Sequence, residues 1–418
     1  MNVFKLSWKY LTFKPLSTGL NLLLLALGLA IITVLLLIQN QVEKKMTQDA
    51  EGIDLVVGAK GSPLQIILSA VYHIDFPTGN IPMKEAMRLN QSRLVKSTIP
   101  LALGDNYQGY RVVGTNHDYL ALHQVNYQEG IAWEKPFEVV LGATVARKSG
   151  LKVGDSFTGS HGISEGSHDH EAHDFKVVGV LEPKGTVVDR LVMTSLESVW
   201  LTHDEEENTE LVEESDAEHQ AKFHSPVAKT GFPKTEIDRD VTALLVQYRS
   251  PMAAVQLPRM INSATSMQAA SPTFEMSRLF ELLGVGVSLL QGLAFVLIAI
   301  SGLGIFIALY NSLKERKYDL AILRAIGASG LQLLMMVFLE GIILTTLGAI
   351  FGIILGHSFL ALLVFQNDQG VAASLQPWVF LKQELWIVVY ALLVGIAASL
   401  IPAWTAYQTS IAKQLTKA

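Results

Sequence analysis

The sequence predicts an α-helical membrane protein with four transmembrane helices, and with a mixed α/β extracytoplasmic domain inserted between helices 1 and 2. Three observations lead to this fold class. Half of the residues are hydrophobic and only 17% are charged, which is too apolar for an ordinary soluble protein. Four runs reach the length of about 20 apolar residues that a spanning helix needs. The acidic residues concentrate in a long segment between the first and second runs.

The first run, residues 15–42, follows a basic amphipathic N-terminus, residues 1–14. Its apolar core is longer than that of a secretory signal, and QNQVEKKM follows it where a signal has a small-residue cleavage site. We therefore expect a retained membrane anchor. The other predicted spans are residues 282–313, 331–365 and 385–412, and Glu340 is the only charged residue among these three.

The basic residues beside the spans predict the orientation of the chain. With four spans they all fall on one side, which the positive-inside rule assigns to the cytoplasm of a bacterial inner (plasma) membrane. The segment 43–281 and the loop 366–384 are then extracytoplasmic, and the tail 413–418 is cytoplasmic. The residues concerned are Lys5, Lys9, Lys14, Lys314, Arg316, Lys317, Arg324, Lys413 and Lys417.

The extracytoplasmic segment alternates strand-like and helix-like stretches. Residues 53–57 read as a short apolar strand, followed by a Gly/Ser/Pro turn and a helical run. Residues 175–181 and 187–193 read as strands on either side of a turn. The flanks QNQVEKKMTQDAEG and SPTFEMSRLFELL are expected to be helical stalks that carry spans one and two outward.

Two insertions, residues 160–174 and 203–224, are rich in histidine and acidic residues. Acidic tracts with few aromatic residues are typical of solvated surface segments. Imidazole and carboxylate together also suit zinc or another divalent metal, although no spacing here matches a defined motif. The candidate ligands are His161, His168, His170 and His173.

No motif of an enzyme is present. The sequence has no cysteine, which excludes thiolate zinc sites and a thiol nucleophile. It lacks G-x-x-x-x-G-K-[ST], G-x-S-x-G and H-E-x-x-H, so we expect neither a nucleotide-hydrolysing P-loop nor a serine or zinc hydrolase site. Nothing in the charge pattern indicates a nucleic-acid partner.

The short loop between spans two and three, residues 314–330, reads as an amphipathic helix. Its expected apolar face carries Leu313, Leu320, Leu323 and Ile326, and Gly327 and Ser329 are expected to end it and cap the next helix. A hairpin connection needs only a few residues, so this longer helix is also a candidate surface for a partner. The candidate coupling residues are Lys314, Glu315, Arg316, Lys317, Asp319, Arg324, Ala325, Gly327, Ala328 and Ser329.

The stretch KERKYDLAILRAIGAS resembles the hallmark of the FtsX/MacB/LolC-type ABC permease family, the mechanotransmission (type VII) class of ABC transporters. The opening FKLSWKYLTFKPLSTGLNLLLLALGLAI is similar to the family's first segment, and EVVLGATVARKSGLKVGDSF to strands of its periplasmic core domain. FLEGIILTTLGAIFGIILG resembles its third span. The histidine-rich insertions and the opening DLVVGAKGSPLQIILSAVYHIDFPTGN depart from the family pattern and indicate a distinct branch.

The resemblance implies a homodimer that binds two copies of a separate cytoplasmic ATPase, which would use ATP and Mg²⁺. The chain itself would bind no cofactor directly. Closure of the ATPase would move the extracytoplasmic domains and drive export or extraction of a lipoprotein, peptide, lipid, drug, haem or metal. Membrane lipid and a periplasmic protein are further expected partners. Two alternatives stay open: an FtsX-like signal transmitter that regulates an outer partner such as a cell-wall hydrolase, and a membrane-anchored metal-binding protein.

Several residues inside the spans invite a functional or a packing interpretation. Gly348, Gly352 and Gly356 are spaced by four, which predicts a face for close helix contact. Glu340 is an intramembrane carboxylate and therefore a functional candidate; relatives carry Glu at this place, which implies a shared conformational or hydrogen-bonding role. The remaining expectations are that His357 lies at the membrane interface and that Pro402 kinks or ends span four.

Overall fold

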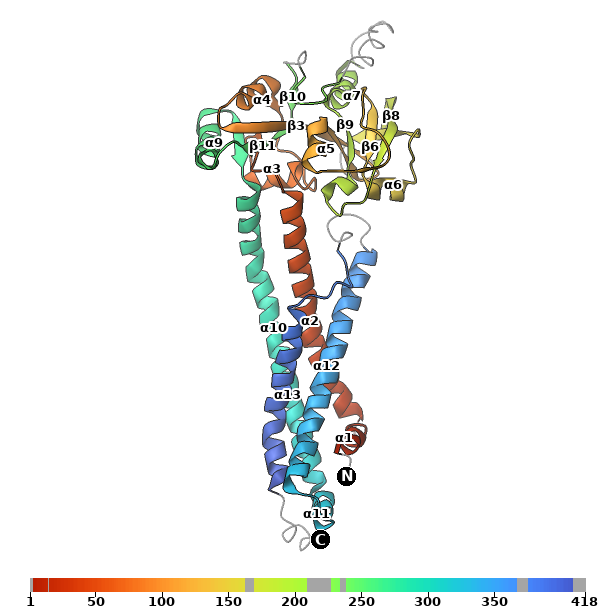
Figure 1. Cartoon of the computed structure of the whole chain (residues 1–418), viewed down its shortest axis with the longest axis vertical. Helices are drawn as coiled ribbons and strands as arrows, with labels where there is room; N and C mark the ends of the chain where they lie inside the picture. Colours follow the sequence, from red (N-terminus) through yellow and green to blue (C-terminus); the bar gives the residue numbers. More distant parts are fainter. Residues whose placement is uncertain are drawn as a thin grey trace. The chain divides into compact units, whose positions relative to one another are not determined.

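The computed structural model describes residues 3–13, 15–161, 169–208, 227–233, 238–366 and 375–408, with only the backbone for some residues beside the gaps. The chain divides into two compact units. One, which we call the membrane unit, contains Met1–Glu43 and Glu281–Ala418; the other, the outer unit, contains Lys44–Phe280. Figure 1 shows the helices of the first and the sheet of the second.

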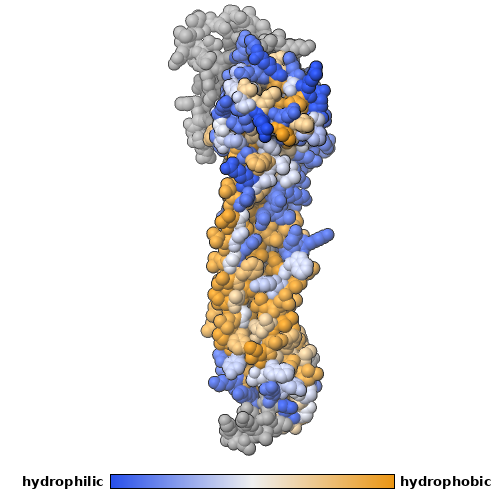
Figure 2. Space-filling view, turned by 90° about the vertical axis from the view of Figure 1, so that its left-hand side faces the viewer, coloured by the Kyte–Doolittle hydropathy of each residue, from blue (hydrophilic) through white to orange (hydrophobic). Residues whose placement is uncertain are grey.

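The membrane unit confirms the predicted four apolar helices, since four of its helices are long and apolar enough to cross a bilayer. Figure 2 shows apolar side chains over most of the visible face of this unit. Two of the four continue beyond the predicted spans through the expected stalk sequences, α2 at its C-terminal end and α10 at its N-terminal end. The helices are α1 (Val3–Leu11), α2 (Pro15–Asp49), α10 (Pro272–Glu315), α11 (Lys317–Ala325), α12 (Gly330–Gln366) and α13 (Glu384–Tyr407).

The three predicted packing glycines of α12, Gly348, Gly352 and Gly356, lie against α2. A Cβ atom added at Gly348 would lie 2.5 Å from the side chain of Leu25, and one added at Gly352 would lie 2.8 Å from Leu29. Gly356 makes an equally close approach one turn further along α2. Because helices in lipid associate by van der Waals packing and not by the hydrophobic effect, this close approach is what holds α2 to α12.

Span four excludes one of the two predicted effects of Pro402, that it ends the helix, and the predicted kink stays a prediction. Pro402 lies inside α13, which continues to Tyr407, so this proline does not end the helix. Pro402 is buried against the bundle, in a helix whose side chains Ala403 and Ala406 pack on α12.

The outer unit contains a mixed sheet of ten strands. Along the sheet the strands follow the order β12-β1-β11-β3-β4-β9-β6-β8-β5, and β7 pairs with β3 and β8. A separate two-stranded sheet joins β10 and β2. The strands are β1 (Leu55–Ala59), β2 (Ile81–Pro82), β3 (Val95–Tyr107), β4 (Tyr110–Thr115), β5 (Tyr127–Gly130), β6 (Glu138–Leu141), β7 (Ser156–His161), β8 (Asp169–Leu181), β9 (Val192–Ser195), β10 (Asp240–Val241), β11 (Ala243–Tyr248) and β12 (Met267–Ala270).

Short helices cover this sheet and enclose two apolar cores. One core joins β1 and β11 to α4, α7 and α9 through Leu55, Leu244 and Leu257. The other joins β6 and β8 to α6. The helices are α3 (Pro63–Ala70), α4 (Met83–Asn90), α5 (His117–Leu122), α6 (Ala143–Ser149), the 3₁₀ helix η1 (Val187–Arg190), α7 (Leu196–Asn208) and α9 (Pro251–Ala264).

The first strand of the outer unit lies two residues beyond its predicted place, and the turn and helix follow it. Leu55, Val56 and Val57 are fully buried because β1 pairs with β11 on one side and β12 on the other. Ser62 then caps α3 by accepting a hydrogen bond from the backbone of Gln65, with Pro63 as the first helical residue.

The predicted strand 187–193 is wrong in its first half. Val187–Arg190 forms η1, and only Val192 onward joins the sheet. Asp49 at the end of α2 accepts a hydrogen bond from the Val187 amide at 2.8 Å, and Asp189 accepts from the amides of Lys184 and Gly185. These carboxylates satisfy backbone donors in place of a neighbouring strand.

The core beside α3 and α5 contains two buried histidines. His73 lies 3.2 Å from the hydroxyl of Tyr119, and the ring of Tyr119 packs against that of His123. Burial lowers the pKa of His123 to about 4, helped by the charge of Lys184, and burial holds the pKa of His73 well below its ordinary value. Both imidazoles are therefore neutral at neutral pH.

Candidate functional site

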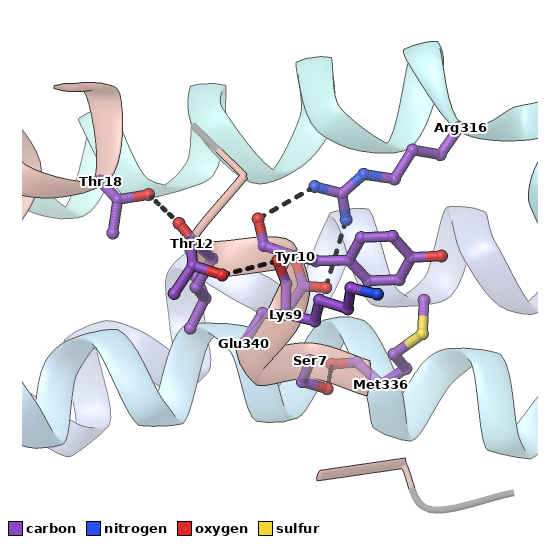
Figure 3. A network of polar contacts seen from close by, with 9 residues as sticks. Ser7, Lys9, Tyr10, Thr12, Thr18, Arg316, Met336 and Glu340 are labelled. Carbon is purple, nitrogen blue, oxygen red and sulfur yellow. Dashed lines mark hydrogen bonds and ion pairs between the residues drawn. The ribbon is translucent and has the colours of Figure 1, made fainter. Parts of the chain in front are cut away.

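The predicted cytoplasmic helix begins with a break in the backbone at Arg316. Helix α10 ends at Glu315, and Arg316 leaves the helical conformation before α11 starts at Lys317. This break turns the Arg316 side chain inward. Its guanidinium donates to the carbonyl oxygen of Tyr10 at 3.4 Å and to Glu340 at 3.5 Å, and it lies 3.8 Å from the centre of the Tyr10 ring (Figure 3). One cation therefore joins α1, α12 and the start of α11.

Helix α1 is docked on α12 by a second polar contact. The hydroxyl of Ser7, fully buried, donates to the carbonyl oxygen of Met336 at 3.0 Å (Figure 3). The link to α2 is fixed as well, since Thr18 donates to the carbonyl of Leu11 at 3.1 Å. The basic N-terminal segment is thus a packed part of the membrane unit.

An apolar cluster lies beside these contacts and contains side chains of α1, α10, α11, α12 and α13. Leu313 of α10 and Leu320 of α11 are buried against Leu333 of α12. Leu323 of α11 and Leu6 of α1 pack on its margin. A displacement of α11 therefore disturbs α1, α10 and α12 together.

The predicted apolar face of α11 is correct for Leu320 and Leu323, but Ile326 is 79% exposed. Ile326 lies outside α11, because the helix ends at Ala325 and the chain turns at Gly327. Tyr318 is also exposed, at 50%. Arg316 was predicted as a coupling residue, and this needs a second correction. Its side chain faces into the helix bundle and is not part of the exposed surface of α11. Of the candidate coupling residues, those exposed are Lys314, Glu315, Asp319, Ala325, Gly327 and Ser329, and those half-buried are Lys317, Arg324 and Ala328.

The end of α11 and the start of α12 have the expected local chemistry. Gly327 has φ 105°, a left-handed conformation that glycine adopts at little cost. Ser329 accepts a hydrogen bond from the amide of Gln332, and Gln332 accepts one from the amide of Ser329. This reciprocal pair is a capping box that starts α12 directly after the turn.

Glu340 is only 3% exposed, and Arg316 is its cationic partner. A buried carboxylate without a partner is strongly unfavourable, so the pair constrains where Arg316 can lie. Of the two roles predicted for Glu340, the structure shows an interhelical hydrogen bond with Arg316, and the conformational role stays a prediction. The sequence did not single out Tyr10 or Ser7, because an aromatic and a hydroxyl on an amphipathic helix carry no motif.

The histidine candidates for metal binding cannot be assembled into a site from the described side chains. His161, His170 and His173 belong to the backbone of β7 and β8, so these strands extend into the predicted insertion 160–174. His168 and most of the second insertion, 203–224, lie outside the described residues, apart from the end of α7. In the part of the chain that the structure describes, no group of three potential ligands could hold a metal ion. Metal binding stays a prediction.

Two family models match the chain. The model of the MacB-like periplasmic core domain matches residues 18–257, and that of the FtsX-like permease C-terminal matches residues 292–411. The first alone spans more than half of the chain. The chain belongs to the FtsX/MacB-type family of ABC permeases. It is therefore a multi-pass inner-membrane protein with a large extracytoplasmic domain, and its family implies a cytoplasmic ATPase partner.

Two solved structures are similar to part of the chain at low sequence identity. The periplasmic region of MacB from Actinobacillus actinomycetemcomitans is 11% identical, with a TM-score of 0.34, covering 56% of this chain and 97% of that one. The extracellular domain of the noncanonic ABC-type transporter YknZ from Gram-positive bacteria is 13% identical, with a TM-score of 0.28, covering 52% and 99%. No curated relative matches the chain.

The two matched models describe the membrane and periplasmic parts of a permease. Neither matched model is an ATPase domain, and members of this family are typically the membrane subunits of ABC transporters and not enzymes themselves. The family implies an ATPase partner, and the sequence predicted a partner surface on residues 314–330. In the structure, the exposed part of that surface lies at the end of α10, on α11 and in the turn after it.

Proposed function

We propose that this permease couples ATP hydrolysis by a separate cytoplasmic ATPase to movement of its outer unit. The ATPase docks on the exposed, cytoplasmic face of α11 and the following turn, through Tyr318, Asp319 and Ile326. Two permeases and two ATPases form the working complex. The movement exports or extracts a substrate on the outer side of the membrane.

The observation that carries this proposal is the position of Arg316. It lies between the docking helix α11 and the spanning helix α10, and its side chain contacts α1 and α12. A push on α11 must either carry these helices along or break the contacts of a largely buried cation. Helix α10 then runs without interruption from Glu315 back to Pro272, about 65 Å at 1.5 Å per residue. An unbroken helix of this length is a stiff element for transmitting displacement.

The exposed side chains of the docking face support an apolar contact with a charged margin. Ile326 and Tyr318 are exposed at 79% and 50%, although they adjoin a cluster that buries most apolar residues near them. Burying one such side chain against a partner contributes about 1.5–3 kcal/mol. Placing an aspartate there would remove this contribution and add a desolvation cost.

The test is co-purification of the full-length chain with the ATPase encoded beside it. We expect Ile326→Asp and Tyr318→Asp to reduce the recovered ATPase at least tenfold. Ile131→Asp is a matched control, since Ile131 is 62% exposed in the outer unit. Equal recovery with all three variants would refute docking on this face. A complex that hydrolyses ATP and changes the activity of an extracytoplasmic hydrolase, but transports no substrate, would favour the regulatory alternative.

A further inference from the structure

The loop between α12 and α13 is fastened to both helices by a buried histidine. His357 of α12 has no exposed surface, and its Nδ1 lies 2.5 Å from the carbonyl oxygen of Pro377 in the loop. Its Nε2 lies 3.1 Å from Glu384 at the start of α13, which is 4% exposed. The other oxygen of Glu384 accepts from the amide of Leu381. His357 is thus a buried anchor, and its expected position at the depth of the membrane interface stays a prediction.

Aromatic side chains of the same loop enclose this anchor. The ring of Trp378 stacks on His357 at 5.8 Å with an interplanar angle of 6°, and the ring of Phe380 lies 4.6 Å away. Both ring nitrogens of His357 lie within hydrogen-bonding distance of oxygen atoms, those of Pro377 and Glu384, beside the aromatic rings of the loop. Breaking one member of such a buried pair is strongly unfavourable. The loop therefore stays attached to α12 and α13.

The same loop contacts α2 through a different kind of interaction. The side-chain NH₂ group of Gln41 donates to the backbone carbonyl oxygen of Gln376 at 3.0 Å. The side-chain oxygen of Gln41 accepts from the backbone N–H of Gln376 at 2.7 Å. Both hydrogen bonds are neutral and solvent-exposed. Water can replace each of them at little net cost, so this contact is easily broken and remade.

An apolar cluster lies close to Gln41 on α2. Leu37 of α2 is buried against Leu360 of α12 and Leu375 of the loop. In lipid such contacts have no hydrophobic driving force, because lipid tails are as apolar as leucine. The cluster therefore attaches α2 to the loop by van der Waals packing alone.

We propose that residues 375–384 form a clasp with a permanent side, His357–Glu384, and a releasable side, Gln41–Gln376. In each transport cycle the clasp frees the end of α2 at Gln41, beyond the glycine contacts that hold α2 to α12. Release of α2 can reach the outer unit, because α2 continues past the boundary between the two units at Glu43 and ends at Asp49. The inference rests on the proposed ATP-driven movement, and it names the contact at the outer end of the membrane unit that this movement opens.

The test uses the absence of native cysteine. Cysteines at positions 41 and 376 are joined by a short, reducible thiol cross-linker in the full-length permease–ATPase complex. We expect the ATPase rate to fall at least tenfold on cross-linking and to return on reduction. Single-cysteine variants treated with the same reagent should keep their rate. An unchanged rate at complete cross-linking would overturn the proposal.

A second pair separates the two sides of the clasp. Cysteines at positions 360 and 375 join the loop to α12, and we expect their cross-link to leave the ATPase rate within twofold of the uncross-linked complex. A tenfold loss there would show that the loop leaves α12, and the permanent side would be wrong. Absence of any associated ATPase activity in the unmodified complex would instead count against the proposed function.

A variant without cysteine gives an independent measurement. Gln41→Ala removes both hydrogen bonds of the releasable side, and we expect it to raise the substrate-free ATPase rate several-fold. Gln41→Glu keeps an acceptor for the amide of Gln376 but has no amide donor, so we expect an intermediate rate. Rates equal to that of the unmodified complex in both variants would contradict a clasp that opens during the cycle.

Discussion

Replacing Arg316 by alanine should release α1 from the bundle. Two of the contacts of Arg316 hold α1: the hydrogen bond to the Tyr10 carbonyl at 3.4 Å and the stacking of the guanidinium on the Tyr10 ring at 3.8 Å. The long charged hydrogen bond and the cation–π contact contribute about 1 kcal/mol each. Loss of about 2 kcal/mol raises the undocked population of α1 about 30-fold, since 1.4 kcal/mol is a factor of ten.

Cysteine labelling measures this population directly. Ser7 is fully buried, and the chain has no native cysteine, so Ser7→Cys introduces one reporter thiol. Its rate of modification by a membrane-permeant maleimide should rise about 30-fold when Arg316→Ala is added. A reporter at Tyr318, which is already 50% exposed, should react at the same rate in both backgrounds.

Glu340→Gln is the matched control for the charge. Glutamine keeps an oxygen that can accept a hydrogen bond from Arg316, so labelling at position 7 should change less than threefold. If Arg316→Ala left the labelling rate of the Ser7→Cys variant unchanged, Arg316 would not hold α1, and the coupling argument built on it would fail.

Three further predictions concern packing, capping and pH. Gly352→Ala should destabilise the detergent-solubilised chain by about 1–3 kcal/mol, since its Cβ would lie 2.8 Å from Leu29; Gly19→Ala, with open space around it, should leave the unfolding temperature unchanged. Ser329→Ala removes the acceptor for the Gln332 amide and should cost about 1 kcal/mol, measured in the same assay, whereas Ser329→Asp should retain stability. The folded state favours neutral His123, because burial lowers its pKa from 6.5 to about 4. The contribution of His123 to the stability of the outer unit should therefore be constant above pH 6.5 and fall by up to about 3 kcal/mol as the pH drops toward 4. His123→Gln should flatten this fall; an identical pH dependence in variant and parent would contradict the assignment.

The sequence predicted the membrane fold well because its signals are local. Apolar length alone identifies spans, and continuation of the helical pattern identified the stalks on α2 and α10. Gly327 and Ser329 were likewise read from their immediate neighbours, since turn and cap chemistry depends on adjacent backbone groups.

Errors arose where a distant residue decides the structure. Val187 and Val188 are β-branched and strand-like in isolation, but Asp49, more than a hundred residues earlier, binds the amide of Val187. Ile326 fits the spacing of an apolar face, yet the helix ends before it. Arg316 reads as one of several surface charges, and only the break before α11 turns it toward Tyr10 and Glu340.

By itself, the sequence determined the four spans, their orientation, the inserted mixed domain and the permease family, because length, charge asymmetry and a contiguous motif are properties of the chain alone. The tertiary structure decided which side chains meet. It joined Arg316 to Glu340 and Tyr10, and His357 to Glu384, from helices that are far apart in sequence. Such pairs have no spacing to read, since their geometry exists only after the helices pack.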